Sequence, residues 1–195
     1  MSSIFKKEPN ELRTHLGLFT KHSYSPQAVA KQELGKHGYG YDNDLSTMNT
    51  KVFTKGGVPT IVHRGSTRLS DWLDNAKIAV GITPQRILDA QALTKKVEAK
   101  YGTGANQIGH SLGGKIAEQA SSSKGQVLTY NKAGGLFDTQ NKYGANQLDV
   151  RARGDPLGRT TTTQSANRET IENKSKSSNP FINAINAHST KNLFV

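Results

Sequence analysis

The sequence predicts an α/β fold in which a predominantly parallel sheet is flanked by helices. Short β-branched runs alternate with longer helical patterns between about residues 50 and 153. This alternation is typical of crossover units, which pair their strands in parallel. A glycine-rich turn at residues 109–114, between a strand pattern and a helix pattern, points to the same class. A length of 195 residues fits a single domain.

The N-terminal part is expected to be a basic, irregular segment over residues 1–40, followed by the main domain over residues 41–195. Its hydrophobic periodicity is confined to Leu12, Leu16 and Phe19. This weak pattern predicts a helix or two and then a glycine-rich loop.

A β-hairpin is predicted next, because β-branched runs at residues 51–54 and 58–63 flank the turn Lys55-Gly56-Gly57. Apolar residues at helical spacing follow and predict a short amphipathic helix. They are Leu69, Trp72, Leu73, Ala76 and Val80.

The clearest helical pattern runs from Thr83 to about Lys100, with a proline in its first turn and a glycine beyond its end. Strands are predicted at residues 106–108, 126–130 and 147–153. The stretch 158–180 is rich in Thr, Ser, Asn and Lys, and is expected to be a polar surface loop.

Composition limits the chemistry. There is no cysteine, which excludes disulfides, thiolate metal sites and a cysteine nucleophile. The histidines lack metal-ligand spacing, so neither a metal nor a cofactor is expected. The net charge of +11 favours anionic partners such as the surface of an anionic membrane. Nucleic acid is not favoured, since no nucleic-acid-binding signature accompanies the charge.

No targeting segment is visible in the sequence. The N-terminus turns polar after two apolar residues, unlike a secretory signal peptide. No apolar run approaches the roughly 20 residues that a membrane-spanning helix needs. The expected location is therefore intracellular, in the cytoplasm.

The glycine turn carries the strongest functional signal. Gly109-His110-Ser111-Leu112-Gly113 fits the pattern Gly-x-Ser-x-Gly, in which a sharp strand-to-helix turn exposes a nucleophilic serine. Side chains at positions 109 and 113 are expected to clash with the closely packed strand and helix. Ser111 is therefore the candidate nucleophile.

A serine nucleophile needs a general base and an acid that orients the base. In this type of turn the chain order is Ser, Asp or Glu, His. His188 is the one histidine of six that follows Ser111. Asp155 is the preferred acid because it follows a predicted strand directly, where α/β sites assemble. Asp138 is the alternative, and Asp149 would lie inside the strand.

An acyl-transfer site also requires donors for the developing oxyanion. The backbone N–H of Leu112, at the start of the predicted helix, is one candidate. Ser66, which closes the second strand of the hairpin, is the other.

Several segments together resemble the class 3 lipases of the α/β-hydrolase fold over roughly residues 40–193. They are His63-Arg-Gly-Ser-Thr67, Asp71-Trp72, Gly109-His-Ser-Leu-Gly-Gly114, Gly154-Asp-Pro156 and His188. The resemblance implies a catalytic Ser111, Asp155 and His188 with an oxyanion residue at Ser66. It also implies that Leu69, Trp72 and Leu73 form a lid, whereas their helical spacing equally fits a core helix. The chain is short for that family, which implies a trimmed sheet.

The residues around His63 and the segment Tyr130-Asn-Lys-Ala-Gly-Gly135 are similar to those of small lipase-like proteins encoded by large DNA viruses. This resemblance implies a virion-associated location as the alternative to the cytoplasm. The expected function is therefore that of a serine hydrolase, a lipase or esterase, acting on a lipid carboxylic ester of an acylglycerol or phospholipid. The alternative is a non-catalytic structural or binding protein on the same scaffold, such as a virion component docked on other virion proteins. The sequence predicts no oligomeric state.

Overall fold

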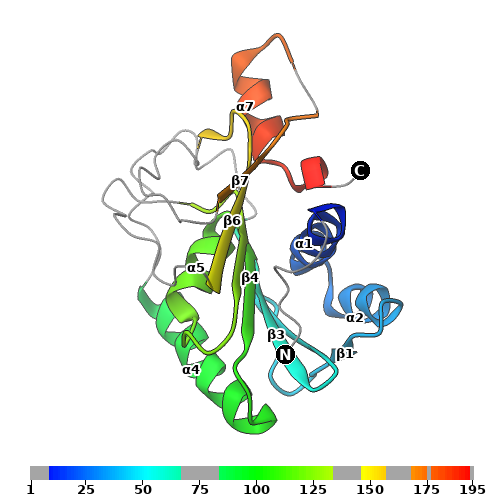
Figure 1. The fold of residues 1–195 in the computed structure, drawn as a ribbon, viewed down its shortest axis with the longest axis vertical. Helices are drawn as coiled ribbons and strands as arrows, with labels where there is room; N and C mark the ends of the chain where they lie inside the picture. Colours follow the sequence, from blue (N-terminus) through cyan, green and yellow to red (C-terminus); the bar gives the residue numbers. More distant parts are fainter. Residues whose placement is uncertain (1–8, 67–83, 134–145, 157–167, 175–176, 194–195) are drawn as a thin grey trace.

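The computed structural model describes residues 9–66, 84–133, 146–156, 168–174 and 177–193. Within these ranges the strands form one seven-stranded sheet whose spatial order follows the chain (Figure 1). The strands are β1 (Gly40–Tyr41), β2 (Thr50–Lys55), β3 (Val58–His63), β4 (Asn106–His110), β5 (Val127–Tyr130), β6 (Gln147–Ala152) and β7 (Arg168–Ile171). The helices are α1 (Pro9–Ser23), α2 (Gln27–Gly35), α4 (Pro84–Tyr101), α5 (Leu112–Ala120), α7 (Pro180–His188) and the short 3-10 helix η4 (Thr190–Leu193).

The sheet is antiparallel at one end and parallel through the rest. β1, β2 and β3 pair antiparallel. Each pair from β3 to β7 is parallel, which confirms the predicted α/β class. The carboxyl ends of β3 to β6 therefore lie along one edge of the sheet, the edge where functional sites of α/β proteins assemble.

Helices cover both faces of the sheet (Figure 1). A connection between neighbouring parallel strands is almost always right-handed, so successive crossovers in one direction place their helices on the same face. α4 and α5 follow this rule and pack against each other. α1 and α2 cover the opposite face, where α1 contacts β3, β4 and β5.

The hairpin predicted from the sequence is present. β2 and β3 pair over their full length, from Thr50 opposite His63 to Lys55 opposite Val58. The turn residues Gly56 and Gly57 have φ of 58° and 77°. A two-residue hairpin turn with positive φ at both positions matches the twist of the strands, and glycine adopts it without a steric cost.

The N-terminal segment differs from the irregular structure expected for residues 1–40. It contains α1 and α2, which contribute fully buried side chains to the main core. The Phe19 ring meets Tyr39 and Phe53 edge-on, with centroid distances of 5.0 and 5.6 Å. The helical signal was weak because α1 buries only a narrow apolar stripe, but this stripe covers the face of the sheet opposite the described crossover helices α4 and α5.

The strand before the glycine turn is unusually polar, and the structure shows why this is tolerated. Gln107 on β4 is fully buried, yet both ends of its amide are hydrogen-bonded. Its oxygen accepts from His63 Nε2 at 2.7 Å, and its nitrogen donates to Thr94 Oγ1 at 3.0 Å. This polar bridge joins two strands to α4, so β4 does not need the apolar side chains usual in a buried parallel strand.

The prediction of a polar loop over residues 158–180 is wrong in part. This stretch contains β7, an edge strand that pairs in parallel with β6, and the first residue of α7. β7 was missed because an edge strand with one neighbour needs few buried apolar residues, and here Ile171 is the apolar one. The predicted helix and lid residues Leu69, Trp72 and Leu73 lie outside the described residues.

Replacing Phe19 by alanine should lower the free energy of unfolding by about 3–5 kcal/mol, as for other fully buried aromatic side chains. Urea denaturation followed by circular dichroism measures the change. The control is Val29→Ala on α2, a side chain that is 42% exposed, for which we expect almost no loss. Equal losses in the two variants would show that α1 is not part of the cooperative core.

Burial lowers the pKa of His63 from 6.5 to about 4, although the Gln107 hydrogen bond opposes the shift. The unfolded chain therefore takes up this proton first, so stability is lost as the pH falls from about 6.5 towards 4. His63→Asn should reduce proton uptake on unfolding at pH 5 by about one, which flattens the slope of stability against pH. Urea titrations between pH 4.5 and 6 measure this slope, with the exposed His37→Asn as the control. An unchanged slope in His63→Asn would contradict a buried neutral imidazole.

Candidate active site

Ser111 occupies the sharp turn between β4 and α5. Its backbone has φ 57° and ψ −126°, a conformation that costs a non-glycine residue about 1–3 kcal/mol. The turn is held by its own main chain: the N–H of Ser111 donates to the carbonyl of Tyr130 at 3.0 Å. The Ser111 carbonyl accepts from the N–H groups of Gly114 and Ala133 at 3.0 and 3.1 Å. The strained conformation is therefore fixed from both sides.

The glycines of the motif are required by close packing. A Cβ on Gly109 would overlap the carbonyl of Gly113 in α5. A Cβ on Gly113 would overlap the carbonyl of His63 at the end of β3. The sequence-based expectation of a clash at both positions is confirmed, and the clash partners are main-chain atoms that cannot move aside.

His188 and Asp155 form a buried hydrogen-bonded pair. Asp155 lies just beyond β6, and His188 is the last residue of α7. The distance from His188 Nδ1 to Asp155 Oδ1 is 2.7 Å, and both side chains are almost fully buried. A carboxylate only accepts, so Nδ1 carries the hydrogen. In the neutral ring this leaves the lone pair on Nε2.

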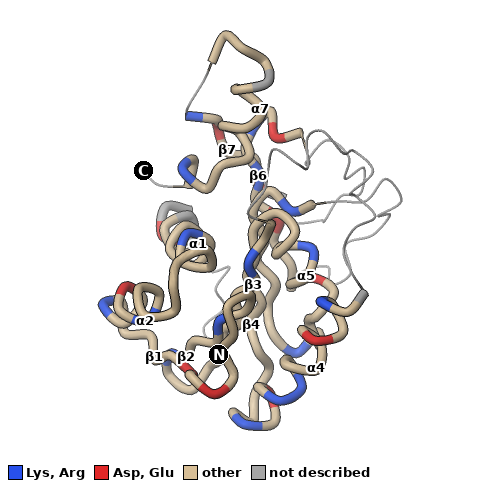
Figure 2. The backbone as a smooth tube through the Cα atoms, turned by 180° about the vertical axis from the view of Figure 1, so that it is seen from behind, with Lys and Arg blue, Asp and Glu red and all other residues tan. Residues whose placement is uncertain are grey.

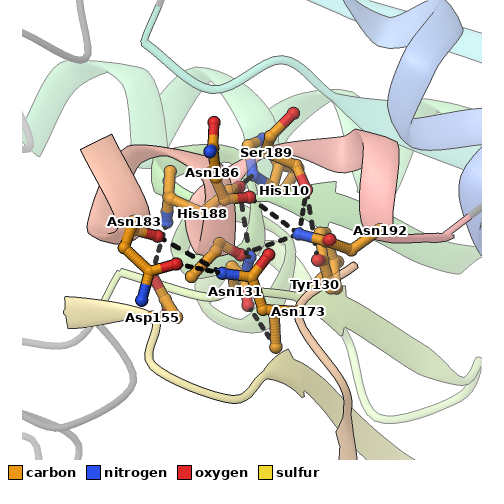
Figure 3. A network of polar contacts seen from close by, with 12 residues as sticks. His110, Tyr130, Asn131, Asp155, Asn173, Asn183, Asn186, His188, Ser189 and Asn192 are labelled. Atoms are coloured by element: carbon orange, nitrogen blue, oxygen red, sulfur yellow. Dashed lines mark hydrogen bonds and ion pairs between the residues drawn. The ribbon is translucent and has the colours of Figure 1, made fainter. Parts of the chain in front are cut away.

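The main chain of His188 is held by two side chains (Figure 3). Its carbonyl accepts from His110 Nε2 at 2.9 Å and from Asn131 Nδ2 at 3.1 Å. Asn131 also accepts from the backbone N–H of Ala152 at 2.8 Å. One asparagine thus ties the end of α7 to the end of β6, directly before Asp155. Sequence reasoning missed Asn131, although its place immediately after a strand at the carboxyl edge was a usable signal.

His110, inside the glycine motif, is buried and uncharged. Burial and the neighbouring His188 lower its pKa to about 3. Its second ring nitrogen, Nδ1, lies 2.8 Å from the hydroxyl of Tyr24, which follows α1. The ring also stacks on Tyr130 with a centroid distance of 5.6 Å. Tyr24 was missed because nothing in the sequence links it to a motif 86 residues away.

A cavity of about 300 Å³ brings the candidate groups together. Ser66, His110, Ser111 and His188 line it with Tyr24, and its remaining lining residues are Ile185, Ser189 and Thr190. Leu112 begins α5 beside Ser111, so its N–H is one of those without a partner inside the helix. A larger cavity of about 380 Å³ lies beside α1, but no serine is among the described residues that line it.

The other candidate acids are placed elsewhere. The carboxylate of Asp149 accepts from Lys132 Nζ at 3.0 Å and from Thr129 Oγ1 at 2.6 Å. Lys132 also pairs with Glu118 on α5. Burial alone would lower the pKa of Lys132, but the two carboxylates outweigh it and raise this pKa. Asp149 therefore serves a partly buried ion cluster, and Asp138 lies outside the described residues.

Two arginines lie next to this site. Arg64 directly precedes Gly65 and Ser66, and its guanidinium lies 5.9 Å from the centroid of the Tyr24 ring. Arg86 on α4 donates to the carbonyl of Arg64 at 2.9 Å. Burial and the charge of Arg64 lower the pKa of Arg86. Among the residues that the structure describes, no carboxylate forms an ion pair with either arginine.

The described residues offer neither a metal site nor a membrane-spanning helix. No group of three or more His, Asp or Glu side chains there is arranged to hold a metal ion. In the same residues, no helix combines the length and the apolarity that a bilayer crossing requires.

Comparison with known proteins places this geometry in context. The phospholipase-like family described as the Tle-like phospholipase domain matches residues 22–157, a range that includes Ser66, Ser111 and Asp155 and ends before His188. The extracellular phospholipase A1 of Serratia liquefaciens is 35% identical over 95 residues. That match covers 46% of this chain and 30% of the relative, so the chain spans less than a third of that protein.

The fold is also similar to a solved structure. The Rhizomucor miehei lipase propeptide complex superposes with a TM-score of 0.53 at 13% identity. The superposition covers 77% of this chain and 63% of the lipase chain, which shows a shared fold. The family match extends over more than half of the chain. The chain therefore belongs to the family of Tle-like phospholipase domains.

Proposed function

We propose that this protein is a serine hydrolase that cleaves a carboxylic ester of a phospholipid. Ser111 Oγ attacks the ester carbonyl while His188 Nε2 accepts its proton. Asp155 holds the imidazole through Nδ1 and stabilises the imidazolium that forms. The protonated His188 then gives its proton to the leaving alkoxide, which leaves an acyl group on Ser111. Water, activated by His188, hydrolyses this acyl-enzyme.

One observation carries the proposal: the buried 2.7 Å hydrogen bond between His188 and Asp155, with His188 and Ser111 lining one cavity. Burying a carboxylate is costly unless it is paired, so a pair used only for folding would bring little stability. An imidazole whose Nδ1 is occupied by a carboxylate presents Nε2 as a base, which a serine nucleophile requires.

The proposed oxyanion donors are the N–H groups of Leu112 and Ser66. The first lies at the N-terminus of α5, where the helix dipole also favours negative charge. The second follows β3, the neighbour of β4 in the sheet, and Ser66 lines the cavity. Each donor of this kind typically contributes about 100- to 1000-fold in rate.

The pair Arg64 and Arg86 favours a phospholipid over an acylglycerol. Two partly buried guanidinium groups that repel each other, without a carboxylate partner in the described residues, are stabilised by a bound anion. The phosphate of a phospholipid supplies that anion, whereas an acylglycerol does not. The family match and the Serratia relative, whose name is phospholipase A1, support the same substrate class.

The net charge adds a more general attraction. Lys and Arg occur on helices of both layers (Figure 2), and the excess over Asp and Glu amounts to +11. A positive surface of this kind concentrates the protein at anionic membranes, with about 1 kcal/mol per basic residue near the surface. Because the positive charge is spread over several elements, we propose that it attracts the protein to the membrane surface and does not recognise one particular headgroup.

Ser111→Ala should abolish ester hydrolysis, because no other described group replaces the nucleophile. Hydrolysis of p-nitrophenyl esters and of phospholipid in mixed micelles measures the loss. Mass spectrometry after reaction with a fluorophosphonate should locate the label at Ser111. The matched control is Ser123→Ala, which removes the hydroxyl of another serine with positive φ and should keep full activity.

A wild-type protein that neither hydrolyses esters nor reacts with the fluorophosphonate would refute the proposed function. The non-catalytic scaffold would then be the better description.

Arg64→Gln should raise KM for phosphatidylglycerol by about 10-fold, the usual loss for one charge-assisted hydrogen bond. KM for diacylglycerol in the same neutral micelles should change by less than about twofold, because this substrate has no phosphate. The exposed Lys124→Gln, which removes one positive charge elsewhere, is the control. An equal loss on both substrates would contradict a role in phosphate binding and point instead to a shift of the adjacent Ser66.

A further inference from the structure

A chain of close contacts runs from the proposed oxyanion loop to His188. Gly65, next to Ser66, packs so closely against the hydroxyl of Tyr24 that a Cβ at this position would overlap it. The Tyr24 hydroxyl and His110 Nδ1 lie 2.8 Å apart, and His110 Nε2 lies 2.9 Å from the His188 carbonyl. Four residues distant in the sequence are thus linked without a gap.

The direction of each bond in this chain is fixed. A carbonyl only accepts, so His110 carries its hydrogen on Nε2. The ring is neutral because its pKa is about 3, so Nδ1 carries none and accepts from Tyr24. Burial raises the pKa of Tyr24 to about 12, which keeps the hydroxyl protonated and able to donate.

We propose that Tyr24 is a positioning residue, which fixes the oxyanion loop relative to the catalytic histidine. The proposal rests on the proposed function of Ser111, His188 and Ser66. Ser66 follows β3 and His188 ends α7, so the two groups come from elements that are far apart in the chain. Tyr24 and His110 connect the oxyanion loop to the end of α7, which fixes the distance between Ser66 and His188.

The packing around Gly65 supports this assignment. A Cβ on Gly65 would overlap the Tyr24 hydroxyl and lie 2.7 Å from the carbonyl of His110. Only glycine allows the loop to approach the tyrosine and the elbow this closely. Tyr24 also lines the cavity with Ser66 and His188, where the proposed ester substrate would bind.

Tyr24→Phe removes the hydroxyl and keeps the ring, so it tests the proposal directly. We expect kcat to fall about 10-fold or more, since small displacements of reacting groups are costly, with KM changed less than about twofold. The rate of fluorophosphonate labelling at Ser111 should fall by a similar factor.

The matched control is Tyr39→Phe, because the Tyr39 hydroxyl also contacts a histidine Nδ1, that of His15, at 3.2 Å. This variant should leave kcat unchanged. Circular dichroism verifies that both variants fold. Unchanged kcat and labelling in Tyr24→Phe, with an active wild type, would overturn the positioning role.

A double-mutant cycle distinguishes a connected chain from two independent contacts. His110→Gln places an amide N–H where Nε2 lies but leaves Tyr24 without its acceptor. If the residues act through one chain, Tyr24→Phe combined with His110→Gln should lose little more than the larger single effect. Losses that multiply would show that Tyr24 does not act through His110.

A spectroscopic readout separates this proposal from the proposed function. In ¹⁵N-labelled protein, Tyr24→Phe should shift the resonances of His110 Nδ1, the Ser66 amide and the His188 ring, whereas Tyr39→Phe should shift none of them. This measurement needs no turnover, so it tests the chain even if the wild type proves inactive. A shift confined to His110 would refute the coupling to Ser66 and His188.

Discussion

The structure of the candidate site depends on the conformation of one residue, the left-handed serine between β4 and α5. A turn this sharp is unfavourable by itself. It persists because β5 supplies a partner for the N–H of Ser111, while α5 and the segment after β5 supply partners for its carbonyl. The close approach of α5 to the ends of β3 and β4 leaves no room for side chains at the two motif glycines. The hydroxyl is consequently presented at the carboxyl edge of the sheet, and the proposed acid, base and oxyanion donors are arranged around that point.

Polar residues organise the surroundings of this turn to an unusual degree. His110, Asn131 and Gln107 are buried, the cluster around Lys132 is partly buried, and each joins two or more elements. Buried polar groups bring little net stability but penalise every arrangement that leaves them without partners. In a chain with a mean hydropathy of −0.64, such bridges specify the geometry where apolar packing alone would leave it loose.

The sequence was informative where local chemistry decides the structure, and less so elsewhere. The hairpin, the long helix and the turn around Ser111 have strong local signals, and Asp155 and His188 were selected by chain order and elimination. The structure pairs these two residues by a hydrogen bond, and their role in catalysis is a proposal. The edge strand β7, the helical N-terminal segment and the roles of Tyr24 and Asn131 depend on distant partners. No periodicity or motif in one sequence records such contacts.

The distance along the chain between the elbow and the end of α7 has a consequence for biosynthesis. His110 and the carbonyl that it holds are 78 residues apart in the sequence. At the usual rate of about 5–20 residues per second, several seconds of translation separate them. The sheet around β4 can pair while the ribosome is still making the segment that carries His188. The proposed nucleophile is therefore synthesised before its base, and the cell that makes this protein holds an incomplete site until α7 docks.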